Sequence, residues 1–323
     1  MKLNDLKWFA AYIALMMIMI PFALMPLRMA IRTGELLGTA LFHLLGKWRE
    51  TGIETVSATL PYLESQPSWE NSGTTPEKII RQVFINIGIL VAELSHLYFG
   101  LEKPLLATVE FRGLDNLEKA HKKGRGVIGI AAHSGNWELM AAAVGASVTP
   151  VSMVAHTMKK SYFDRVLERI RLRHGNRVIY RDNGVRGMFA VLKDNGFLGI
   201  LPDQVVKPPH GILADFLGRP AWTTMMPAKL ALKTGSPMLP FFAHREGGKT
   251  IITIHPELVL SASGSEDERI LDGTTKMNEA ISLHILRHPT QWNWLYRRWK
   301  GTDDLAAFSH EQSDTIQEES LPI

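Results

Sequence analysis

The sequence has no cysteine among its 323 residues. This absence excludes disulfide frameworks, thiolate metal sites and covalent catalysis by a cysteine, and it permits a reducing compartment. The chain also lacks a Gly-x-Ser-x-Gly element and a His-Glu-x-x-His motif. Neither a serine nucleophile on a strained turn nor a helical zinc site is therefore indicated.

Charge is missing from one long stretch near the N-terminus. Residues 8–27 contain no charged side chain, and basic residues flank this stretch on both sides. At 1.5 Å per residue, a helix of this length crosses roughly 30 Å of hydrocarbon. We expect residues 1–30 to form a membrane anchor helix. A cleaved signal peptide is one alternative, and a tilted or interfacial helix kinked at Pro21 and Pro26 is another.

Basic side chains are missing from the other end of the chain. Residues 303–323 hold six acidic residues and no Lys or Arg, so the formal net charge of +4 divides into this acidic end and a body of +10. We expect residues 301–323 to form an acidic, disordered tail. The basic body suggests an anionic membrane surface, an acidic carrier protein or nucleic acid as partner, and an ordinary basic surface is the alternative.

The body of the chain, residues 31–300, has the pattern of one ordered α/β domain. Hydrophobic residues make up 46% of the sequence and charged residues 21%, enough for a substantial core. Short apolar runs alternate with helical patterns, which predicts a largely parallel central sheet flanked by helices. We expect strands at 109–112, 126–132, 149–155, 177–180, 196–201, 238–244 and 250–255. We expect helices at 75–99, 114–122, 137–146, 162–173, 185–194, 221–234 and 272–287.

The segment HSGNWE, residues 133–138, looks like a reaction centre. It follows a continuous apolar strand and leads into an Ala/Leu/Met-rich helix, and open α/β sheets bind ligands at the carboxyl ends of their strands. Glu138 would hydrogen-bond one imidazole nitrogen of His133, and the other nitrogen would remove a proton from an incoming hydroxyl. The alternatives are a structural pair, a metal site and a nucleophilic Ser134. Residues five apart diverge around a helix, and adjacent side chains of an extended segment also diverge, so the last two are disfavoured.

Three further segments, together with this motif, resemble one known protein family. With LPDQ (201–204), DFLGRPAWT (215–223) and QWNWLYRRWK (291–300), the His-x4-Glu motif resembles the lipid A biosynthesis late acyltransferase family, whose fold is lysophospholipid acyltransferase-like. The four segments stand in family order, and the similarity extends over about residues 8–300.

The resemblance implies a bacterial inner-membrane enzyme with its active site on the cytoplasmic side. Such an enzyme moves a fatty acyl chain from acyl carrier protein to a hydroxyl of a lipid A precursor, and nucleic acid is not a partner. Without a cysteine or a serine elbow, direct attack of the hydroxyl on the thioester is the simpler mechanism. We expect neither a cofactor nor a metal.

The resemblance also carries the assignment of site residues. His133 and Glu138 are the expected catalytic residues. Arg171 is chosen from the four arginines of the helix at 162–173 to hold phosphate or the acidic carrier, and Asp203 could equally be a turn residue. Arg297 is placed near a substrate phosphate. The expected substrate-binding residues are Asn136, Arg171, Asp203, Gln204, Phe216, Gly218, Thr223 and Arg297.

Two other functions stay open. One is an acyltransferase of the same fold for another acceptor, such as a lysophospholipid, an aminolipid or a phosphoinositol mannoside, with acyl-CoA or acyl carrier protein as donor. The other is a non-catalytic, membrane-anchored lipid-binding protein. The presence of both His133 and Glu138 argues against the second.

Overall fold

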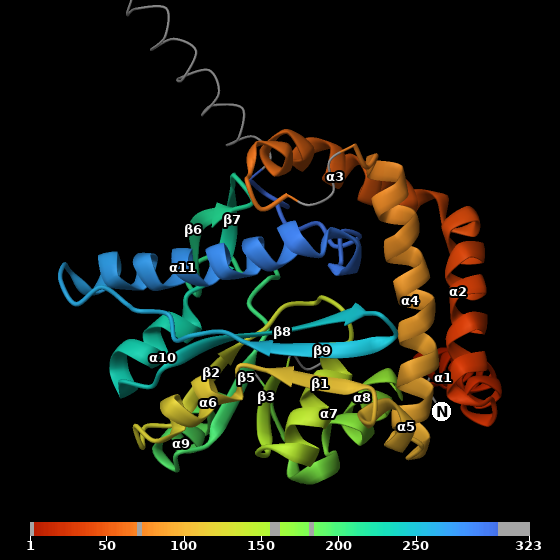
Figure 1. Ribbon diagram of the computed structural model, residues 1–323, viewed down its shortest axis with the longest axis horizontal. Helices are drawn as coiled ribbons and strands as arrows, with labels where there is room; N and C mark the ends of the chain where they lie inside the picture. Colours follow the sequence, from red (N-terminus) through yellow and green to blue (C-terminus); the bar gives the residue numbers. More distant parts are fainter. Residues whose placement is uncertain (1–2, 70–72, 156–161, 181–183, 303–323) are drawn as a thin grey trace, which may run out of the picture.

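The computed structural model describes residues 3–69, 73–155, 162–180 and 184–302. A seven-stranded sheet forms its centre (Figure 1), with strands in the order β1-β9-β8-β2-β5-β3-β4. Every neighbouring pair is parallel except β8 with β9. The predicted α/β fold with a largely parallel sheet is confirmed. The strands are β1 (Val109–Arg112), β2 (Val127–Ile130), β3 (Val151–Ala155), β4 (Arg177–Tyr180), β5 (Phe197–Ile200), β8 (Met238–Glu246) and β9 (Lys249–Ile254).

The central strands are apolar on both faces because helices cover both sides of the sheet. Along β2, Ile128 and Ile130 belong to one buried cluster, whereas Val127 and Ala131 belong to another. The first cluster includes side chains of α9 (Val185–Lys193), α10 (Met226–Thr234) and α11 (Glu266–Arg287). The second includes α6 (Leu114–His121) and α7 (Trp137–Ser147). In Figure 1, α11 lies above the sheet, and α7 and α8 (Tyr162–Arg171) lie below it.

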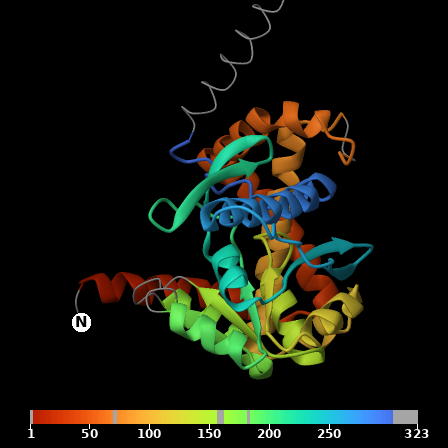
Figure 2. The same ribbon diagram turned by 90° about the vertical axis from the view of Figure 1, so that its left-hand side faces the viewer.

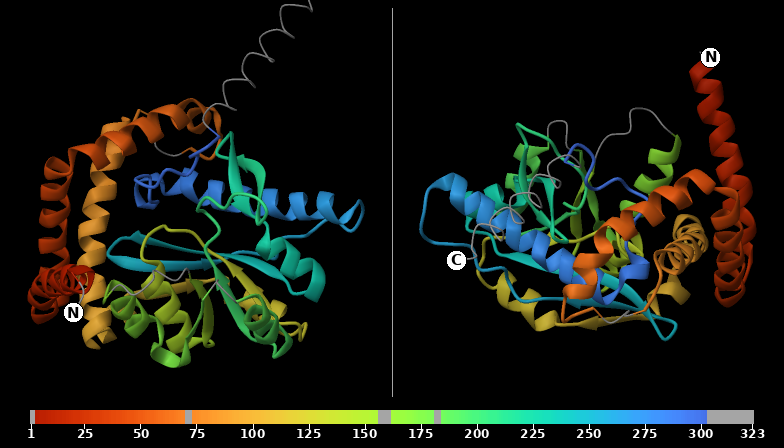
Figure 3. Two further views of the ribbon diagram at one scale, coloured as in Figure 1. Left: turned by 180° about the vertical axis from the view of Figure 1, so that it is seen from behind. Right: turned by 90° about the horizontal axis from the view of Figure 1, so that it is seen from above.

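The first four helices form one flank of the molecule. They are α1 (Leu3–Leu24), α2 (Leu27–Leu44), α3 (Gly46–Ser65) and α4 (Pro76–Phe99). Helices α2 and α4 run side by side (Figure 3), in close contact through glycines. A Cβ on Gly88 would lie 2.0 Å from the carbonyl oxygen of Gly34, so only glycine permits this approach. Shorter elements are α5 (Lys103–Leu106), η1 (Arg173–Gly175) and η3 (Pro289–Gln291).

Helix α4 has the ends that its sequence predicts. The Thr75 side chain caps the first turn by accepting a hydrogen bond from the Lys78 amide, and Pro76 occupies the first helical position. Gly100 ends the helix in the left-handed conformation.

Two helices bear on membrane attachment. By length and composition, α4 is the one helix within the described residues that could cross a membrane, although 56% of its most apolar window is buried inside the protein. The apolar part of α1, Trp8–Leu24, is shorter. Helix α1 extends away from the sheet (Figure 2) and exposes large apolar side chains such as Met17 and Leu24. The anchor expected at residues 1–30 stays a prediction.

One predicted helix is wrong over its first part. Residues 221–224 belong to β7 (Arg219–Thr224), which pairs antiparallel with β6 (Gly211–Phe216), and α10 begins only at Met226. The Ala-rich composition favoured a helix, but the pairing of β7 with β6 overrides this local preference. The predicted acidic tail lies outside the described residues, except for residues 301 and 302.

Candidate active site

The site is built on the turn between β2 and α7. Gly135 lies in this turn with a φ of +60°, and a Cβ there would be 2.5 Å from the Ala243 carbonyl oxygen. Asn136 caps α7, because its side-chain oxygen accepts a hydrogen bond of 2.8 Å from the Leu139 amide. The turn therefore needs a glycine followed by a capping side chain, and it places His133 at the carboxyl edge of the sheet.

A distant segment holds this turn in place. Ser134 forms a β-bridge with Trp292, the Gly135 amide donates to the Gln291 carbonyl at 2.9 Å, and the Asn293 amide donates to the His133 carbonyl at 3.1 Å. The predicted motif and the Trp-rich segment near the C-terminus are thus joined through their backbones. This contact fixes the backbone on both sides of the histidine.

The carboxylate partner of His133 is Asp203. Its Oδ1 lies 2.7 Å from the imidazole Nδ1, and its Oδ2 accepts hydrogen bonds from the His133 amide at 2.8 Å and from the Trp292 indole at 2.9 Å. Asp203 is 2% exposed, just beyond the carboxyl end of β5. The substrate-binding role of Asp203 stays a prediction; in the structure its carboxylate is buried and faces the imidazole.

The pairing changes the protonation of both groups. Burial lowers the pKa of His133, but the adjacent Asp203 carboxylate more than offsets it, so the pKa lies above the usual value of 6.5. Burial raises the pKa of Asp203, and the imidazole together with the hydrogen-bond donors outweighs this effect, so the pKa is lowered. His133 is thus a base whose protonated form is stabilised by a buried anion.

Glu138 has a different partner from the one predicted. Its two oxygens accept hydrogen bonds from the Arg171 side chain, with Nε 3.0 Å from each oxygen and Nη2 also in contact with Oε1. The Trp137 indole donates to the same carboxylate. The predicted hydrogen bond from Glu138 to the imidazole is wrong, because Glu138 lies in the first turn of α7 and faces α8, whereas the imidazole faces Asp203. Sequence analysis selected both Glu138 and Arg171 but did not pair them.

A buried ion pair that sequence analysis missed supports the turn. The Arg245 guanidinium donates to the Glu93 carboxylate of α4, with Nε 3.1 Å from Oε1, and the Asn136 side chain donates to Glu93 Oε2 at 2.8 Å. Asn136 is 1% exposed, and both ends of its amide are engaged. In the structure Asn136 supports the start of α7, and its substrate-binding role stays a prediction. The one signal in the sequence was Glu93, an acid on the apolar face of a helix.

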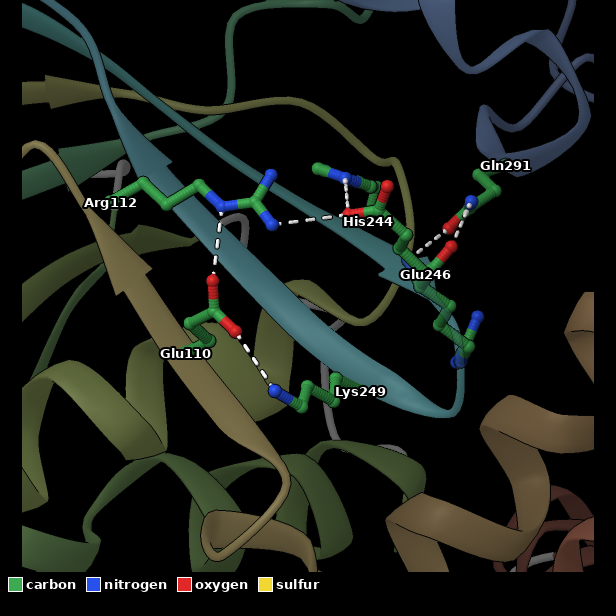
Figure 4. A network of polar contacts seen from close by, with 7 residues as sticks. Glu110, Arg112, His244, Glu246, Lys249 and Gln291 are labelled. Atoms are coloured by element: carbon green, nitrogen blue, oxygen red, sulfur yellow. Dashed lines mark hydrogen bonds and ion pairs between the residues drawn. The ribbon is translucent and has the colours of Figure 1, made fainter.

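Figure 4 shows a second polar network on the outer side of β8. Arg112 contacts Glu110 at 3.1 Å and Glu246 at 3.2 Å, and Lys249 contacts Glu110 at 3.1 Å. These side chains are 40–62% exposed, so their contribution to stability is small. Gln291 lies beside this network and bonds the backbone amide and carbonyl of Arg245, which connects the surface to the buried ion pair.

An apolar cavity of about 450 Å³ opens next to His133. It extends between α7 and the sheet, and Trp137, Arg171 and Gln204 line it together with His133. Gln204 is exposed, and its side-chain nitrogen lies 3.4 Å from the imidazole Nε2. His133, Glu138, Arg171 and Gln204 are therefore the predicted site residues that line this cavity, and Asp203 contacts His133 from behind it.

The other predicted site residues lie outside this cavity. Phe216 is fully buried beside Trp292, Gly218 occupies the β6–β7 turn with a φ of +73°, and Thr223 is buried, accepting a hydrogen bond from Asn278. None of these three residues lines the His133 cavity. Phe216 and Thr223 pack the hairpin against the core, and the substrate-binding roles of all three residues stay predictions.

Arg297 lies in a second hollow, of about 290 Å³, between α3 and the C-terminal segment. Arg219 and Lys300 line it as well, opposite Glu54. Among the described residues, no three side chains of the His, Asp and Glu type are grouped so as to hold a metal ion.

A family profile described as bacterial lipid A biosynthesis acyltransferase matches residues 2–301. The chain is 23% identical to the lipid A biosynthesis acyltransferase of Haemophilus influenzae over 308 residues, which cover 92% of this chain and 89% of that protein. It is 27% identical to the lipid A biosynthesis palmitoleoyltransferase of Escherichia coli, covering 72% of this chain and 74% of that one. It is also 26% identical to the phosphatidylinositol mannoside acyltransferase of Mycolicibacterium smegmatis, covering 58% of this chain and 60% of the relative's length.

Proposed function

Because the chain belongs to the bacterial lipid A biosynthesis acyltransferase family, we propose that it transfers a fatty acyl chain from acyl carrier protein to a hydroxyl of a lipid A precursor. The observation that carries this proposal is the His133–Asp203 pair at the mouth of an apolar cavity. A general base beside a space for hydrocarbon is what hydroxyl acylation requires.

In the proposed reaction, His133 Nε2 takes the proton of the acceptor hydroxyl as its oxygen attacks the thioester carbonyl carbon. The imidazolium is stabilised by the buried Asp203 carboxylate at Nδ1. The tetrahedral intermediate then collapses, its carbon–sulfur bond breaks, and the leaving thiolate takes the proton from His133. The acyl group passes directly to the acceptor, and the protein forms no covalent intermediate.

Glu138 and Arg171 form the second charged pair of the proposed site. Two-point contact with Glu138 fixes the plane of the guanidinium at the cavity wall. We assign Arg171 to binding oxygen atoms of the substrates, and Glu138 to holding it there. Gln204, beside Nε2, is assigned to the acceptor hydroxyl.

Arg297 is assigned to an anionic group of the acceptor, in the hollow that it shares with Lys300. Arg219 at one end of β7 lines this hollow, and Thr224 at the other end lines the His133 cavity. The two residues are five positions apart along the strand, roughly 17 Å. An extended glycolipid with a phosphate far from its reacting hydroxyl suits this spacing.

The enzyme is proposed to act at the cytoplasmic side of the bacterial inner membrane. The exposed apolar residues of α1 and the formal charge of +10 on residues 1–302 support attachment to an anionic bilayer.

A glycolipid other than lipid A is the second candidate acceptor. The identity to the phosphatidylinositol mannoside acyltransferase, 26%, lies between the 23% and 27% found for two lipid A enzymes. Purified protein should be incubated with radiolabelled acyl carrier protein thioester or acyl-CoA and with each of three acceptors: a lipid A precursor, a phosphatidylinositol mannoside and a lysophospholipid. We expect transfer from the carrier protein to the lipid A precursor. Turnover with the lysophospholipid alone would contradict the proposal.

Substitution of the base tests the mechanism in the same assay. His133→Ala should abolish transfer, and Glu138→Ala should lower it on the order of 10²-fold or more. Lys119→Ala, at an exposed position on α6, is the matched control and should keep the wild-type rate. A folded His133→Ala variant with wild-type turnover would show that the imidazole is not the base.

A further inference from the structure

Two glycines face each other at the centre of the sheet. Gly129 of β2 and Gly199 of β5 are register partners, and both line the His133 cavity. Neither has the left-handed φ that favours glycine, and glycine weakens a strand interior. Space, not backbone conformation, is therefore the reason for a glycine at both positions.

The glycines form one level of a layered cavity wall. Residues of one strand face give successive levels: Ala131 and Leu201 near the mouth, then the glycine pair, then Phe197. His133 lies four positions after Gly129, so the glycine level lies at most about 13 Å from the histidine along the strand. A ligand that starts at His133 would meet the glycines with its far end.

A side chain at either glycine would fill this space. At Gly199 it would enter the cavity directly, and at Gly129 it would displace a neighbouring ring into the cavity. Gly199 is partly accessible although its neighbours Leu198 and Ile200 are buried. A Cβ on Gly199 would have a single described neighbour within 4 Å, Val151 Cγ1 at 3.2 Å, so a methyl group would project into the cavity.

At Gly129 the space is taken by an aromatic ring. A Cβ there would lie 2.6 Å from the ring of Phe197, which packs against Phe241 with ring centroids 4.9 Å apart. Phe197 is 4% exposed because it lies over the bare glycine backbone. A methyl group on Gly129 would push this ring toward the cavity.

From these contacts we propose that Gly129 and Gly199, with the ring of Phe197 below them, set the length of acyl chain that the enzyme accepts. The inference rests on the proposed acyl transfer, because it assigns the cavity to the acyl chain. Addition of a methyl group at the glycine level shortens the cavity, and replacement of Phe197 by a smaller side chain deepens it. Discrimination of one methylene in an apolar pocket is about 10-fold or more, so single substitutions are enough to change the preference.

Three variants test the proposal: Gly199→Ala, Phe197→Leu and, as control, Gly46→Ala, whose added Cβ would have no described neighbour closer than 3.7 Å. Each receives an equimolar mixture of acyl carrier protein thioesters of 10 to 18 carbons, and mass spectrometry measures the products. Gly199→Ala should change the ratio of short to long product about tenfold toward short chains, and Phe197→Leu should change it toward long chains. The control should keep the wild-type ratio.

A binding assay without turnover separates this inference from the proposed function. Saturated fatty acids of 10 to 18 carbons displace cis-parinaric acid from each variant, whose folding is checked by circular dichroism. If Gly199→Ala favours shorter acids while no variant transfers acyl groups, the proposed function fails and the length-setting role stands. If folded Gly199→Ala and Phe197→Leu keep the wild-type length profile in both assays, the inference is overturned.

Discussion

At the scale of single residues, Asp203 fixes the orientation of His133, the base of the proposed mechanism, and raises its pKa. Its carboxylate already accepts three hydrogen bonds, two from His133 and one from Trp292. Such a preorganised anion orients the imidazole and needs no rearrangement when the imidazolium forms. The two hydrogen bonds to one histidine, through its amide and its ring, also fix the direction of Nε2 toward the cavity.

Asp203→Asn should therefore change the pH dependence of transfer as well as its rate. Without the carboxylate, burial is left as the dominant influence, so the pKa of His133 should fall from above 6.5 to below it. In wild type the acid limb of kcat/KM should lie above pH 6.5, and in Asp203→Asn it should move to lower pH. The maximal rate should fall roughly 10²- to 10⁴-fold. A pH–rate profile from pH 5 to 9 measures both effects, and an unmoved acid limb would argue against Asp203 as the partner of the base.

Many residues of the site could be predicted from the sequence, but which of their side chains contact one another could not. His133 at the end of a buried strand was readable from local pattern, as was Arg171 on a basic helix. The contact between His133 and Asp203 joins residues 70 positions apart, so it depends on β2 and β5 lying side by side. Glu93 belongs to a helix outside the sheet, and no local rule indicates its ion pair with Arg245.

At the scale of elements, the glycine contact between α2 and α4 determines how the N-terminal helices pack. The start of α4 and the parallel strands followed from capping residues and apolar runs. Helix α11 shows what was overlooked: it begins at Glu266, not at residue 272, with a capping box formed by Ser265 and Glu268 that the sequence already contained. The β6–β7 hairpin could not be anticipated in the same way, because its pairing was stronger than the helical composition of residues 221–224.

Gly88→Ala should destabilise the protein. The added Cβ would lie 2.0 Å from the Gly34 carbonyl oxygen and 2.6 Å from the Gly38 amide nitrogen, both backbone atoms, so the helices must separate. We expect the free energy of unfolding to fall by about 1–3 kcal/mol, measured by urea titration. Gly187→Ala in α9 is the control, because its Cβ would make ordinary contacts beginning at 3.5 Å. It should be neutral or slightly stabilising, and equal losses in both variants would argue against the tight α2–α4 contact.

At the scale of the whole molecule, a group of histidines connects α11 with β8. The rings of His244 and His288 stack with centroids 3.9 Å apart, and His284 lies 3.0 Å from the Ser134 hydroxyl, next to the base. Burial, followed by the neighbouring His244, lowers the pKa of His288 to about 4. Burial also lowers the pKa of His284. These rings are neutral in the folded protein at neutral pH.

The protein should therefore lose stability as the pH falls from 6.5 to 4. A histidine with a depressed pKa takes up its proton first in the unfolded chain, so the stability present above pH 6.5 is lost on acidification through this window. The Asp203 carboxylate has a lowered pKa, so its contribution to stability is lost only below about pH 3.8. We expect Tm to fall by several degrees between pH 6.5 and 4.5 in differential scanning calorimetry. His288→Phe keeps an aromatic ring against His244 without titrating, and it should reduce this slope, whereas an unchanged slope would exclude His288 as a source.

The backbone bridge between Ser134 and Trp292 also determines when the site can assemble during protein synthesis. During synthesis, His133 and Asp203 leave the ribosome well before Trp292, which follows Asp203 by 89 residues. At 5–20 residues per second this interval is about 4–18 s. For that period the nascent chain carries its base and its acid without the indole that holds Asp203 and without the segment that holds the turn. On the proposed mechanism we expect acyl transfer to begin only when the Trp292 segment is in place, long after the N-terminal apolar helix has been synthesised.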